Sequence, residues 1–407
     1  MRVLCTCLPG HGHFNPMLPL AHALARAGHD VGFATAAEFG PRIVEAGFTA
    51  FAAGLSLPDQ LARARASYPD QDALVGGDRF EQFVPRMLAG VAAPARAADL
   101  VPIVADWRPD LVVHDETEFA GPVAAAVAGI PHADHSVLIL RPLSMARLAG
   151  EVLAPLCRDH GVDVGPFGGL FRYLYLDVVP PSLQSHEIDQ IDVAHPVQNA
   201  SIDAGAEGAT LPEWVADLGD RPVVYVSLGT VFNHRARAVF DAVLAALHDE
   251  DVSVIVTVGM DTDPAEFGPQ PGHIHIERFI PQSLLLPFCD VVVNQGGTAL
   301  LAILAHGLPL LVLPQGANQF HNAQACVAAG VGRRLLPTEV TAEAVRREVR
   351  ALLHEPALRE SAERVGREIA DMPGPDHGVA LLERLAELRR PLVRADLNGA
   401  TPGAAAP

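Results

Sequence analysis

The chain has 407 residues, and its 29 Lys and Arg against 48 Asp and Glu give a formal net charge of −19. Such an acidic chain lacks the basic footprint of a general nucleic-acid binder and the positive surface that anionic lipid attracts. With 49% hydrophobic and 19% charged residues, most of the chain is expected to fold, into about two domains.

The first half of the chain alternates predicted strands and helices. Residues 3–8 form a continuous apolar strand, residues 9–15 a loop, and Pro16 opens a helix that ends near Gly28. Pro suits the first turn of a helix and Gly its end. The further predictions in this half are strands at 30–35 and 110–113 and helices at 41–46 and 120–128. This alternation predicts a parallel sheet.

The same pattern starts again near residue 221. The predicted strands of the second half are 222–228, 252–258, 290–293 and 308–313, and the predicted helices are 236–248, 299–306 and 319–329. A boundary between two doubly wound halves is expected in the Gly-, Ala- and Asp-rich stretch 200–222. Residues from 394 onward have a disordered composition.

Two stretches, 54–99 and 135–183, lack a clean hydrophobic period and are rich in Arg, Pro and aromatic residues. Long irregular insertions are often binding loops, but these stretches could equally contain helices that their periodicity does not reveal.

The sequence predicts neither a membrane span nor a secretory leader. No apolar run approaches the roughly 18–20 residues that cross a bilayer. The N-terminal segment has no small-residue cleavage site and predicts a first strand. The five cysteines are scattered, which favours reduced thiols in the cytoplasm. Cys5 and Cys7 share a strand face, and buried packing is favoured over half of a metal site because no second ligand pair follows.

Parallel sheets bind ligands at the carboxyl ends of their strands, so the loops there are the first candidates for a functional site. The first loop carries Gly10, His11, Gly12 and His13, where glycines let a ligand approach the backbone and a helix start favours an anion. A neutral imidazole at His13 could accept a proton near pH 7, or both histidines could be solvated loop residues. A nicotinamide fingerprint would need a third Gly where Asn15 stands, which disfavours that cofactor.

Two further loops place polar groups before a predicted helix. Asp115, between His114 and Glu116, could orient a histidine and stabilise its cation, or cap the next helix, which position alone favours. The stretch 295–298, Gln-Gly-Gly-Thr, could hold a phosphate through backbone N–H groups and the helix dipole, or form a tight packing turn.

Two more loops have weaker signals. The adjacent amides Asn318 and Gln319 could bond the hydroxyls of a polyol or cap the following helix. Asp261 and Asp263 could hold a divalent metal, but the flanking Pro264 and Gly268 favour a plain surface loop.

Taken together, these stretches resemble the family 1 glycosyltransferases of the two-domain GT-B fold. The resemblance covers about residues 1–390, and it is strongest to the actinobacterial enzymes that attach deoxysugars to macrolides, enediynes and aromatic polyketides. Residues 1–31, 110–131 and 223–233 are similar to that family. Residues 278–297 and 304–332 are similar to its donor-binding signature and are the most specific part of the match.

The resemblance implies an α/β fold of two doubly wound, Rossmann-like domains that face each other across a cleft. It implies an N-terminal acceptor domain at 1–205, a nucleotide-sugar domain at 206–375, a helix at 376–392 that crosses back to the N-terminal domain, and a disordered tail at 393–407.

The resemblance also implies roles for single residues. His13 matches the catalytic histidine and Asp115 the acid paired with it. The expected donor-binding residues match positions that contact the diphosphate, the base or the sugar, with one loop glycine added; they are Gly12, Thr230, Phe279, Ile280, Gln282, Gln295, Gly296, Gly297, Thr298, Asn318 and Gln319.

This chain departs from the family pattern at several donor positions. Gln295 stands where the family usually has His, Asn318 where it has Asp, and Phe279 where Trp is common. The Ser-Gly-Thr-Thr that usually follows the glycine pair is one residue short, and only Thr298 supplies a hydroxyl. Gln295 can donate an N–H, although it carries no charge.

The implied reaction is an inverting transfer from a TDP- or UDP-sugar to a hydroxyl of an apolar aglycone, with His13 as general base and no metal or other cofactor. The acceptor is expected between the irregular stretches 54–99 and 135–183. An alternative is a catalytically silent glycosyltransferase-like protein that stabilises a partner transferase, and a nicotinamide oxidoreductase is the third choice. The expected partners are the donor and the acceptor, without nucleic acid or membrane, and a homodimer is one option.

Overall fold

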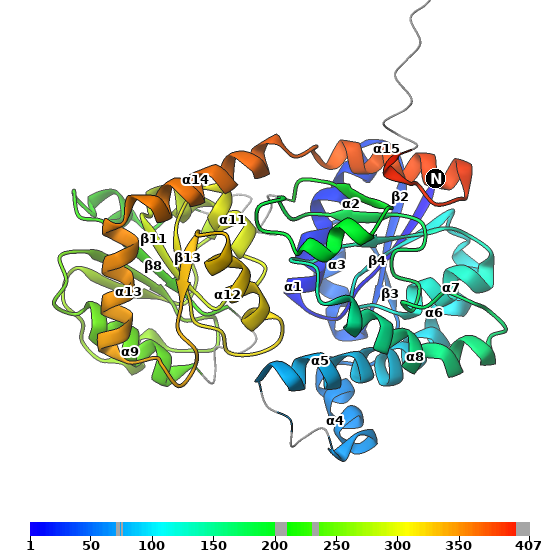
Figure 1. Cartoon of the computed structure of the whole chain (residues 1–407), viewed down its shortest axis with the longest axis horizontal. Helices are drawn as coiled ribbons and strands as arrows, with labels where there is room; N and C mark the ends of the chain where they lie inside the picture. The colour runs from blue at the N-terminus through cyan, green and yellow to red at the C-terminus, as the bar shows by residue number, and fades with distance from the viewer. Residues whose placement is uncertain (71–73, 75, 200–209, 230–235, 396–407) are drawn as a thin grey trace, which may run out of the picture. The chain divides into compact units, whose positions relative to one another are not determined.

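The computed structural model describes residues 1–70, 74, 76–199, 210–229 and 236–395. The chain divides into two compact units, drawn in Figure 1. Unit 1 comprises Met1–Val179, Gln184–Asn199 and Met372–Pro407, and unit 2 comprises Pro180–Leu183 and Ala200–Asp371. The domain boundary expected near residue 205 falls outside the described residues.

The described part of unit 1 contains a parallel sheet of 7 strands in the order β3-β2-β1-β4-β5-β6-β7. The strands are β1 (Arg2–Thr6), β2 (Asp30–Thr35), β3 (Thr49–Ala52), β4 (Leu111–Asp115), β5 (His132–His135), β6 (Tyr175–Asp177) and β7 (Ala194–Pro196). The strand predicted at 3–8 thus begins and ends earlier, and β3, β5, β6 and β7 were not predicted.

Helices cover both faces of this sheet (Figure 1). They are α1 (His11–Phe14), α2 (Leu18–Arg26), α3 (Gly40–Glu45), α4 (Leu57–Ser67), α5 (Gly76–Met87), α6 (Ala93–Trp107), α7 (Ala120–Ala128), α8 (Leu143–Asp159) and α15 (Pro375–Leu388). Successive side chains of β1 point to opposite faces, so Val3 joins a core that includes α2 and α15, whereas Leu4 joins a core that includes α6 and α8.

Most of the first irregular stretch and part of the second are helical. The chain forms α4, α5, a π-helical turn at Leu88–Ala92 and α6 in and beyond the first stretch, and α8 in the second. Pro85, Pro102 and Pro155 lie inside these helices, although proline normally breaks or ends a helix.

One helical segment, Arg79–Trp107, is long and apolar enough to cross a membrane, judged by length and composition alone. The expectation that no apolar run is long enough to span a membrane did not identify this segment. Half of its most apolar window is buried inside the protein, and side chains such as Leu88 and Leu100 belong to the core of unit 1. Burial of this kind is the ordinary explanation for so apolar a helix in a packed domain.

The C-terminal helix α15 belongs to unit 1, where it packs on α2. A Cβ on Gly378 would lie 2.9 Å from Leu20 Cδ1, so the two helices approach closely there. Arg394 N donates to Asp192 O at 2.9 Å, which keeps the start of the expected tail against unit 1. Residues 396–407 lie outside the described residues.

The described part of unit 2 contains a parallel sheet of 6 strands in the order β10-β9-β8-β11-β12-β13. The strands are β8 (Val223–Ser227), β9 (Ser253–Thr257), β10 (Ile274–Glu277), β11 (Val291–Asn294), β12 (Leu310–Val312) and β13 (Gly332–Arg334). The helices are α9 (Arg237–Leu247), α10 (Gln282–Leu285), α11 (Leu300–Ala305), α12 (Gln319–Ala328), α13 (Ala342–His354) and α14 (Pro356–Asp371).

In each sheet the strand order reverses between two central strands, β1 and β4 in unit 1 and β8 and β11 in unit 2. Doubly wound sheets bind ligands at this switch point, outside the carboxyl ends of the strands. His13 and Asp115 lie at or just beyond the ends of β1 and β4, and Gly229 and Gln295 just beyond the ends of β8 and β11. The fold therefore brings predicted site residues to both switch points.

Candidate active site

The switch point of unit 1 joins His13 to Asp115. His13 Nδ1 lies 3.3 Å from Asp115 Oδ2, and the Asp115 side chain is fully buried while that of His13 is 29% exposed. Thr117 Oγ1 lies 3.2 Å from the same nitrogen of His13. The histidine is thus oriented from one side by a carboxylate and a hydroxyl.

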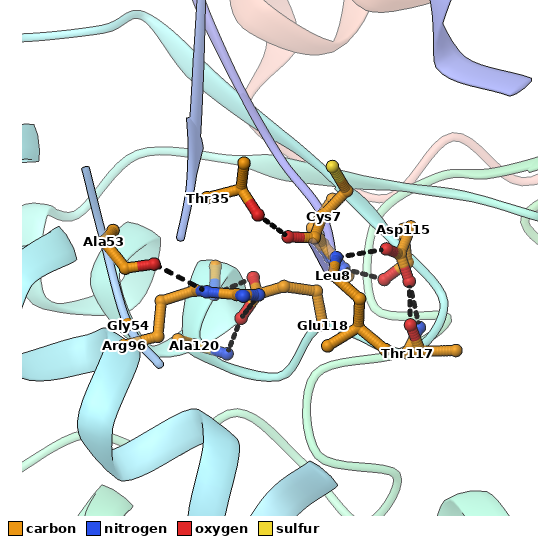
Figure 2. Close-up of polar contacts among 12 residues, drawn as sticks. Cys7, Leu8, Thr35, Ala53, Gly54, Arg96, Asp115, Thr117, Glu118 and Ala120 are labelled. Carbon is orange, nitrogen blue, oxygen red and sulfur yellow. Dashed lines mark hydrogen bonds and ion pairs between the residues drawn. The ribbon is translucent and has the colours of Figure 1, made fainter. Parts of the chain in front are cut away.

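Asp115 is fixed by several donors (Figure 2). Leu8 N donates to its Oδ2 at 2.9 Å, and Thr117 N donates to its Oδ1 at 2.6 Å, with the Thr117 hydroxyl donating to Oδ1 as well. Burial alone would raise the pKa of Asp115. The charge of His13 and the hydrogen bonds from His13, Thr117 and Leu8 outweigh burial and hold this pKa below its ordinary value.

This arrangement decides which nitrogen of His13 is open. Because a carboxylate and a hydroxyl face Nδ1, the proton of the neutral ring belongs on Nδ1 and the lone pair on Nε2. Nε2 has no hydrogen-bond partner among the described residues. The site can therefore accept a proton at Nε2 and stabilise the resulting cation through Asp115.

The predicted loop around His13 is partly wrong. Residues His11–Phe14 form a helical turn, α1, that Gly10 precedes in an extended conformation, and both His13 N and Phe14 N donate to Gly10 O. Gly12 is the second residue of this turn and not part of an open glycine loop. The turn directs the His13 ring toward Asp115. The ring of His11 instead packs edge-on against Phe39, with the two ring centroids 5.3 Å apart.

The alternative role for Asp115, capping the next helix, belongs to Glu118. The two carboxylate oxygens of Glu118 accept from Ala120 N and Gly121 N, each at 2.7 Å, at the start of α7. Figure 2 shows Arg96 beside it, with Arg96 Nη1 3.5 Å from Glu118 Oε1 and both side chains buried. Sequence reasoning missed this ion pair, because Arg96 lies in a stretch without clean periodicity.

Unit 1 also contains a pocket next to this edge. Its lining comes from the ends of α5 and α8, the π-helical turn, and residues 140–142 and 170–171, together with Glu116 and Phe119. These segments belong mostly to the two irregular stretches. Arg141 Nη2 lies 3.3 Å from Glu116 Oε1, which makes an ion pair inside the pocket that sequence reasoning also missed.

At the switch point of unit 2, the side chain of Gln295 lies against two glycines. A Cβ on Gly229 would lie 2.2 Å from Gln295 Nε2, and a Cβ on Gly297 would lie 2.8 Å from it. Gly229 also has φ of +73°, which favours glycine. Gln295 Oε1 is buried and has no hydrogen-bond partner among the described residues. The side-chain amide of Gln295 thus has unused hydrogen-bonding capacity beside Gly229 and Gly297.

The Gly296 amide, an expected phosphate donor, already has a partner within the protein. Gly296 N donates to Asn294 Oδ1, and Gly296 O accepts from Asn322 Nδ2 at 2.7 Å, so both backbone groups are satisfied within the protein. Gly297 N and Thr298 N have no such partner among the described residues. The helix that follows, α11, has 6 residues, so its dipole is smaller than a full-length helix would supply.

The expected base-lining residues differ in exposure. Phe279 is 60% exposed, whereas Ile280 is buried. Gln282 begins α10, and its Nε2 donates to Tyr225 OH at 3.0 Å, which in turn lies 2.8 Å from Thr257 Oγ1. Phe279 is therefore the member of this segment whose side chain is open to a ligand.

The expected sugar-binding amides follow β12. Gln319 is buried, and its Oε1 accepts from Gln315 N at 2.7 Å and from Gly316 N at 3.1 Å, which closes the turn before α12. Its Nε2 has no partner among the described residues. Asn318 precedes α12 without a side-chain cap bond, so helix capping does not explain that residue.

Two further expectations concern the loops of unit 2. Thr230, the expected diphosphate contact after β8, lies outside the described residues. Among the residues that the structure does describe, no three His, Cys, Asp or Glu side chains form a group that could hold a metal ion. Asp263 instead caps the turn Pro264–Phe267 through Ala265 N and lies 3.5 Å from Arg278.

Comparison with known families gives two matches that together span most of the chain. The N-terminal domain model of "Erythromycin biosynthesis protein CIII-like" proteins matches residues 22–229, and the C-terminal domain model of the same proteins matches residues 241–385.

Two characterised relatives match over most of their lengths. The L-demethylnoviosyl transferase of Streptomyces niveus is 34% identical over 82% of this chain and 85% of its own. The aclacinomycin-T 2-deoxy-L-fucose transferase of Streptomyces galilaeus is 29% identical over 96% of this chain and 97% of its own.

Among solved structures, the spinosyn rhamnosyltransferase SpnG complexed with thymidine diphosphate has a TM-score of 0.78 and 27% sequence identity, covering 94% of this chain and 100% of that one. The same enzyme complexed with spinosyn aglycone has a TM-score of 0.79, with the same identity and coverage.

Proposed function

This chain belongs to the erythromycin biosynthesis protein CIII-like family of GT-B glycosyltransferases, and on that premise we propose that it transfers a deoxysugar from a TDP- or UDP-sugar to a hydroxyl of an apolar aglycone. It is a nucleotide-sugar-dependent glycosyltransferase of antibiotic biosynthesis. The relatives named above are transferases themselves, which does not favour a catalytically silent helper. Because SpnG was solved with thymidine diphosphate, TDP-sugars are the first donors to test.

The proposed chemistry begins at His13. Its Nε2 takes the proton of the acceptor hydroxyl as the oxygen attacks the anomeric carbon, and the bond from that carbon to the diphosphate oxygen breaks with inversion. Asp115 and Thr117, which face Nδ1, hold the ring and stabilise the imidazolium. General-base assistance of this kind is worth roughly 10²–10⁴ in rate.

The leaving diphosphate takes the electron pair of the broken bond. We assign its stabilisation to the N–H groups of Gly297 and Thr298 and to the side-chain amide of Gln295, with the hydroxyls of Thr230 and Thr298 as further donors. Preorganised donors aimed at developing charge are often the largest catalytic contribution. The open ring of Phe279 supports stacking with the nucleotide base, and the unpartnered Nε2 of Gln319 supports a bond to a sugar hydroxyl. No step requires a metal ion.

The acceptor is assigned to the pocket of unit 1. Its lining is almost entirely apolar, and it lies beside Glu116, the residue that follows Asp115. An apolar aglycone suits such a lining because its burial removes apolar surface from water on both sides.

The observation that carries this proposal is the His13–Asp115 pair, with Nδ1 held at 3.3 Å and Nε2 without a partner. The test is incubation of the whole chain with TDP- and UDP-deoxysugars and a panel of polyketide aglycones, with release of nucleoside diphosphate and glycoside followed together. Turnover with inverted anomeric configuration supports the proposal. Calorimetry that detects no binding of TDP or UDP, together with no turnover, would overturn it in favour of the silent helper.

A further inference from the structure

The acceptor pocket of unit 1 has two polar lining residues among the described residues, Glu116 and Arg141; the remaining lining is aliphatic or aromatic, including Phe119, Met145 and Phe171. Arg141 is 14% exposed and Glu116 4% exposed at the side chain. A pocket this apolar can discriminate between ligands by polarity only through those two residues.

Arg141 is only partly used by the protein. Its Nη2 donates to Glu116 O at 2.8 Å and lies 3.3 Å from Glu116 Oε1. Its Nε and Nη1 have no partner among the described residues. A guanidinium has five N–H donors in a fixed plane and no acceptor, so Arg141 offers unused donors to whatever enters the pocket.

Glu116, in contrast, is committed to the protein. Its Oε2 accepts from Tyr175 OH at 3.1 Å, and its Oε1 faces Arg141. The carboxylate therefore holds the guanidinium in place and has little capacity left for a ligand. The group that the pocket recognises must accept hydrogen bonds, because the open partner only donates.

The charges around the pair favour a neutral acceptor group over an anion. Glu116 already neutralises Arg141, and the ionised Asp115, the last residue of β4, directly precedes Glu116. A ligand carboxylate would place a third carboxylate near one guanidinium in a buried setting, and its desolvation would not be repaid. A carbonyl oxygen accepts the same hydrogen bonds without adding charge.

We propose that Arg141, positioned by Glu116, is a specificity-determining residue that binds a neutral carbonyl oxygen of an apolar acceptor. This inference rests on the proposed function, because it takes the pocket to be the acceptor site. It adds to that function the group on the acceptor that Arg141 recognises, a neutral hydrogen-bond acceptor.

The test compares three probes by equilibrium dialysis without donor: 1-hydroxyanthraquinone, 1-hydroxyanthracene and anthraquinone-2-carboxylate. The wild-type chain is expected to bind the neutral quinone about tenfold more tightly than the carbonyl-free ring, as one hydrogen bond to a charged donor implies. It is expected to bind the carboxylate more weakly than the neutral quinone.

Arg141→Met should remove the tenfold preference and leave the affinity for 1-hydroxyanthracene within about twofold. Arg147→Met is the matched control, because Arg147 lies in the nearby helix α8 but packs over Phe167 outside the pocket lining. It should keep the preference. Arg141→Lys should keep part of it, since the ammonium still donates hydrogen bonds but lacks the planar geometry of the guanidinium. If Arg141→Met proves unstable because Glu116 loses its partner, the double variant Arg141→Met with Glu116→Gln removes the pair without leaving a buried charge.

A preference unchanged in these variants, a carboxylate that binds more tightly than the quinone, or no binding of either ring system would overturn the inference. The outcome is separable from the proposed function. Binding with the expected preference but no sugar transfer would defeat the transferase assignment alone. Transfer that proceeds with an unchanged KM for carbonyl acceptors in Arg141→Met would defeat the role of Arg141 alone.

Discussion

The switch points of the two sheets use opposite chemistry. In unit 1 the carboxyl ends of β4, β5 and β6 carry buried ionisable groups, among them Asp115, Asp134 and Asp177, with Arg96 and Arg141 packed nearby as counter-charges. In unit 2 the residues that follow β11 and β12, 295–299 and 313–319, include no charged side chain. Their polar groups are amides, hydroxyls and backbone N–H groups.

This difference shows how an acidic chain can serve two substrates of different charge. Buried charges need partners, and unit 1 supplies them through ion pairs and hydrogen bonds that also fix the orientation of His13. A diphosphate brings its own negative charge, so the edge that holds it in our proposal needs donors more than it needs carboxylates. Neutral amides donate without the desolvation cost of a buried cation, although they also bind more weakly.

The largest effect on activity is expected for His13→Ala. We expect turnover to fall by roughly 10²–10⁴-fold, because the variant loses the general base. TDP affinity, measured by calorimetry, should be unchanged, because the residues assigned to the diphosphate belong to unit 2. The matched control is His11→Ala on the same helical turn, whose ring packs on Phe39 and does not contact Asp115.

His11→Ala should keep activity within a few fold. An active His13→Ala enzyme would remove the base assignment, and loss of TDP binding in His13→Ala would show that the two edges are not chemically separate.

Asp115→Asn should have the next largest effect. The amide cannot stabilise an imidazolium as a carboxylate does, so we expect kcat to fall by about 10²-fold. Since the pKa of Asp115 is held below its ordinary value of 3.8, its ionised form stabilises the fold above that pH, and this stabilisation is lost as the pH falls. The loss of Tm in the variant should therefore be largest near neutral pH and shrink toward pH 3.

The control for Asp115→Asn is Glu118→Gln, which changes another buried carboxylate. Glu118 faces Arg96 and the start of α7 and not His13, so this variant should lower Tm but leave kcat within a few fold. Equal losses of kcat in both variants would mean that packing, and not the charge beside His13, carries the effect.

In unit 2, Gln295→Ala tests whether the Gln295 side chain binds the diphosphate or obstructs its site. If the amide donates to the diphosphate, we expect the Kd for TDP to rise about tenfold, the value of one hydrogen bond to a charged group. Thymidine, which lacks the diphosphate, should bind equally well to both proteins. Tighter TDP binding in Gln295→Ala would show that the side chain, packed against Gly229 and Gly297, instead obstructs the site.

The sequence predicted the parts of the fold whose signal is local. The strand at Asp30–Thr35 and the helix at Ala120–Ala128 have the predicted bounds. The pairing of His13 with Asp115 came from the family resemblance and from the position of both at strand ends, and the geometry brings them together. Such features need only neighbouring residues or a known pattern.

What the sequence did not predict depends on partners far along the chain. Strand β5 has the sequence His-Ala-Asp-His, which no hydropathy pattern marks as buried. Part of its polar contacts come from β4, as in the 3.0 Å contact between His132 Nδ1 and His114 Nε2. The Arg96–Glu118 pair likewise joins separate elements. At Gly296, the local pattern suggested a free amide, but Asn294 and Asn322 occupy its backbone groups.

The smallest effect on activity is expected for Asp177→Asn at the end of β6. This substitution most directly tests how burial affects the ionisable groups of unit 1. Burial, with Glu116 as a smaller contribution, raises the pKa of Asp177 from 3.8 to about 7, against the hydrogen bonds from Val179 and Gln184 that lower it. The unfolded chain ionises this carboxyl above about pH 4, whereas the folded chain resists ionisation until about pH 7. Folded stability therefore falls across that window and stays low above it.

Asparagine keeps the acceptor oxygen and removes the charge, so Asp177→Asn should be more stable than the wild type at pH 8, on the order of 2–4 kcal/mol at most, and equal to it at pH 4. That corresponds to a rise in Tm of several degrees, measured by calorimetry at both values of pH. Asp192→Asn, an exposed carboxylate before β7, should change Tm little at either. Equal Tm of Asp177→Asn and wild type at pH 8 would mean that Asp177 is better solvated than its burial implies. The two switch points would then differ in residue type and not in electrostatics.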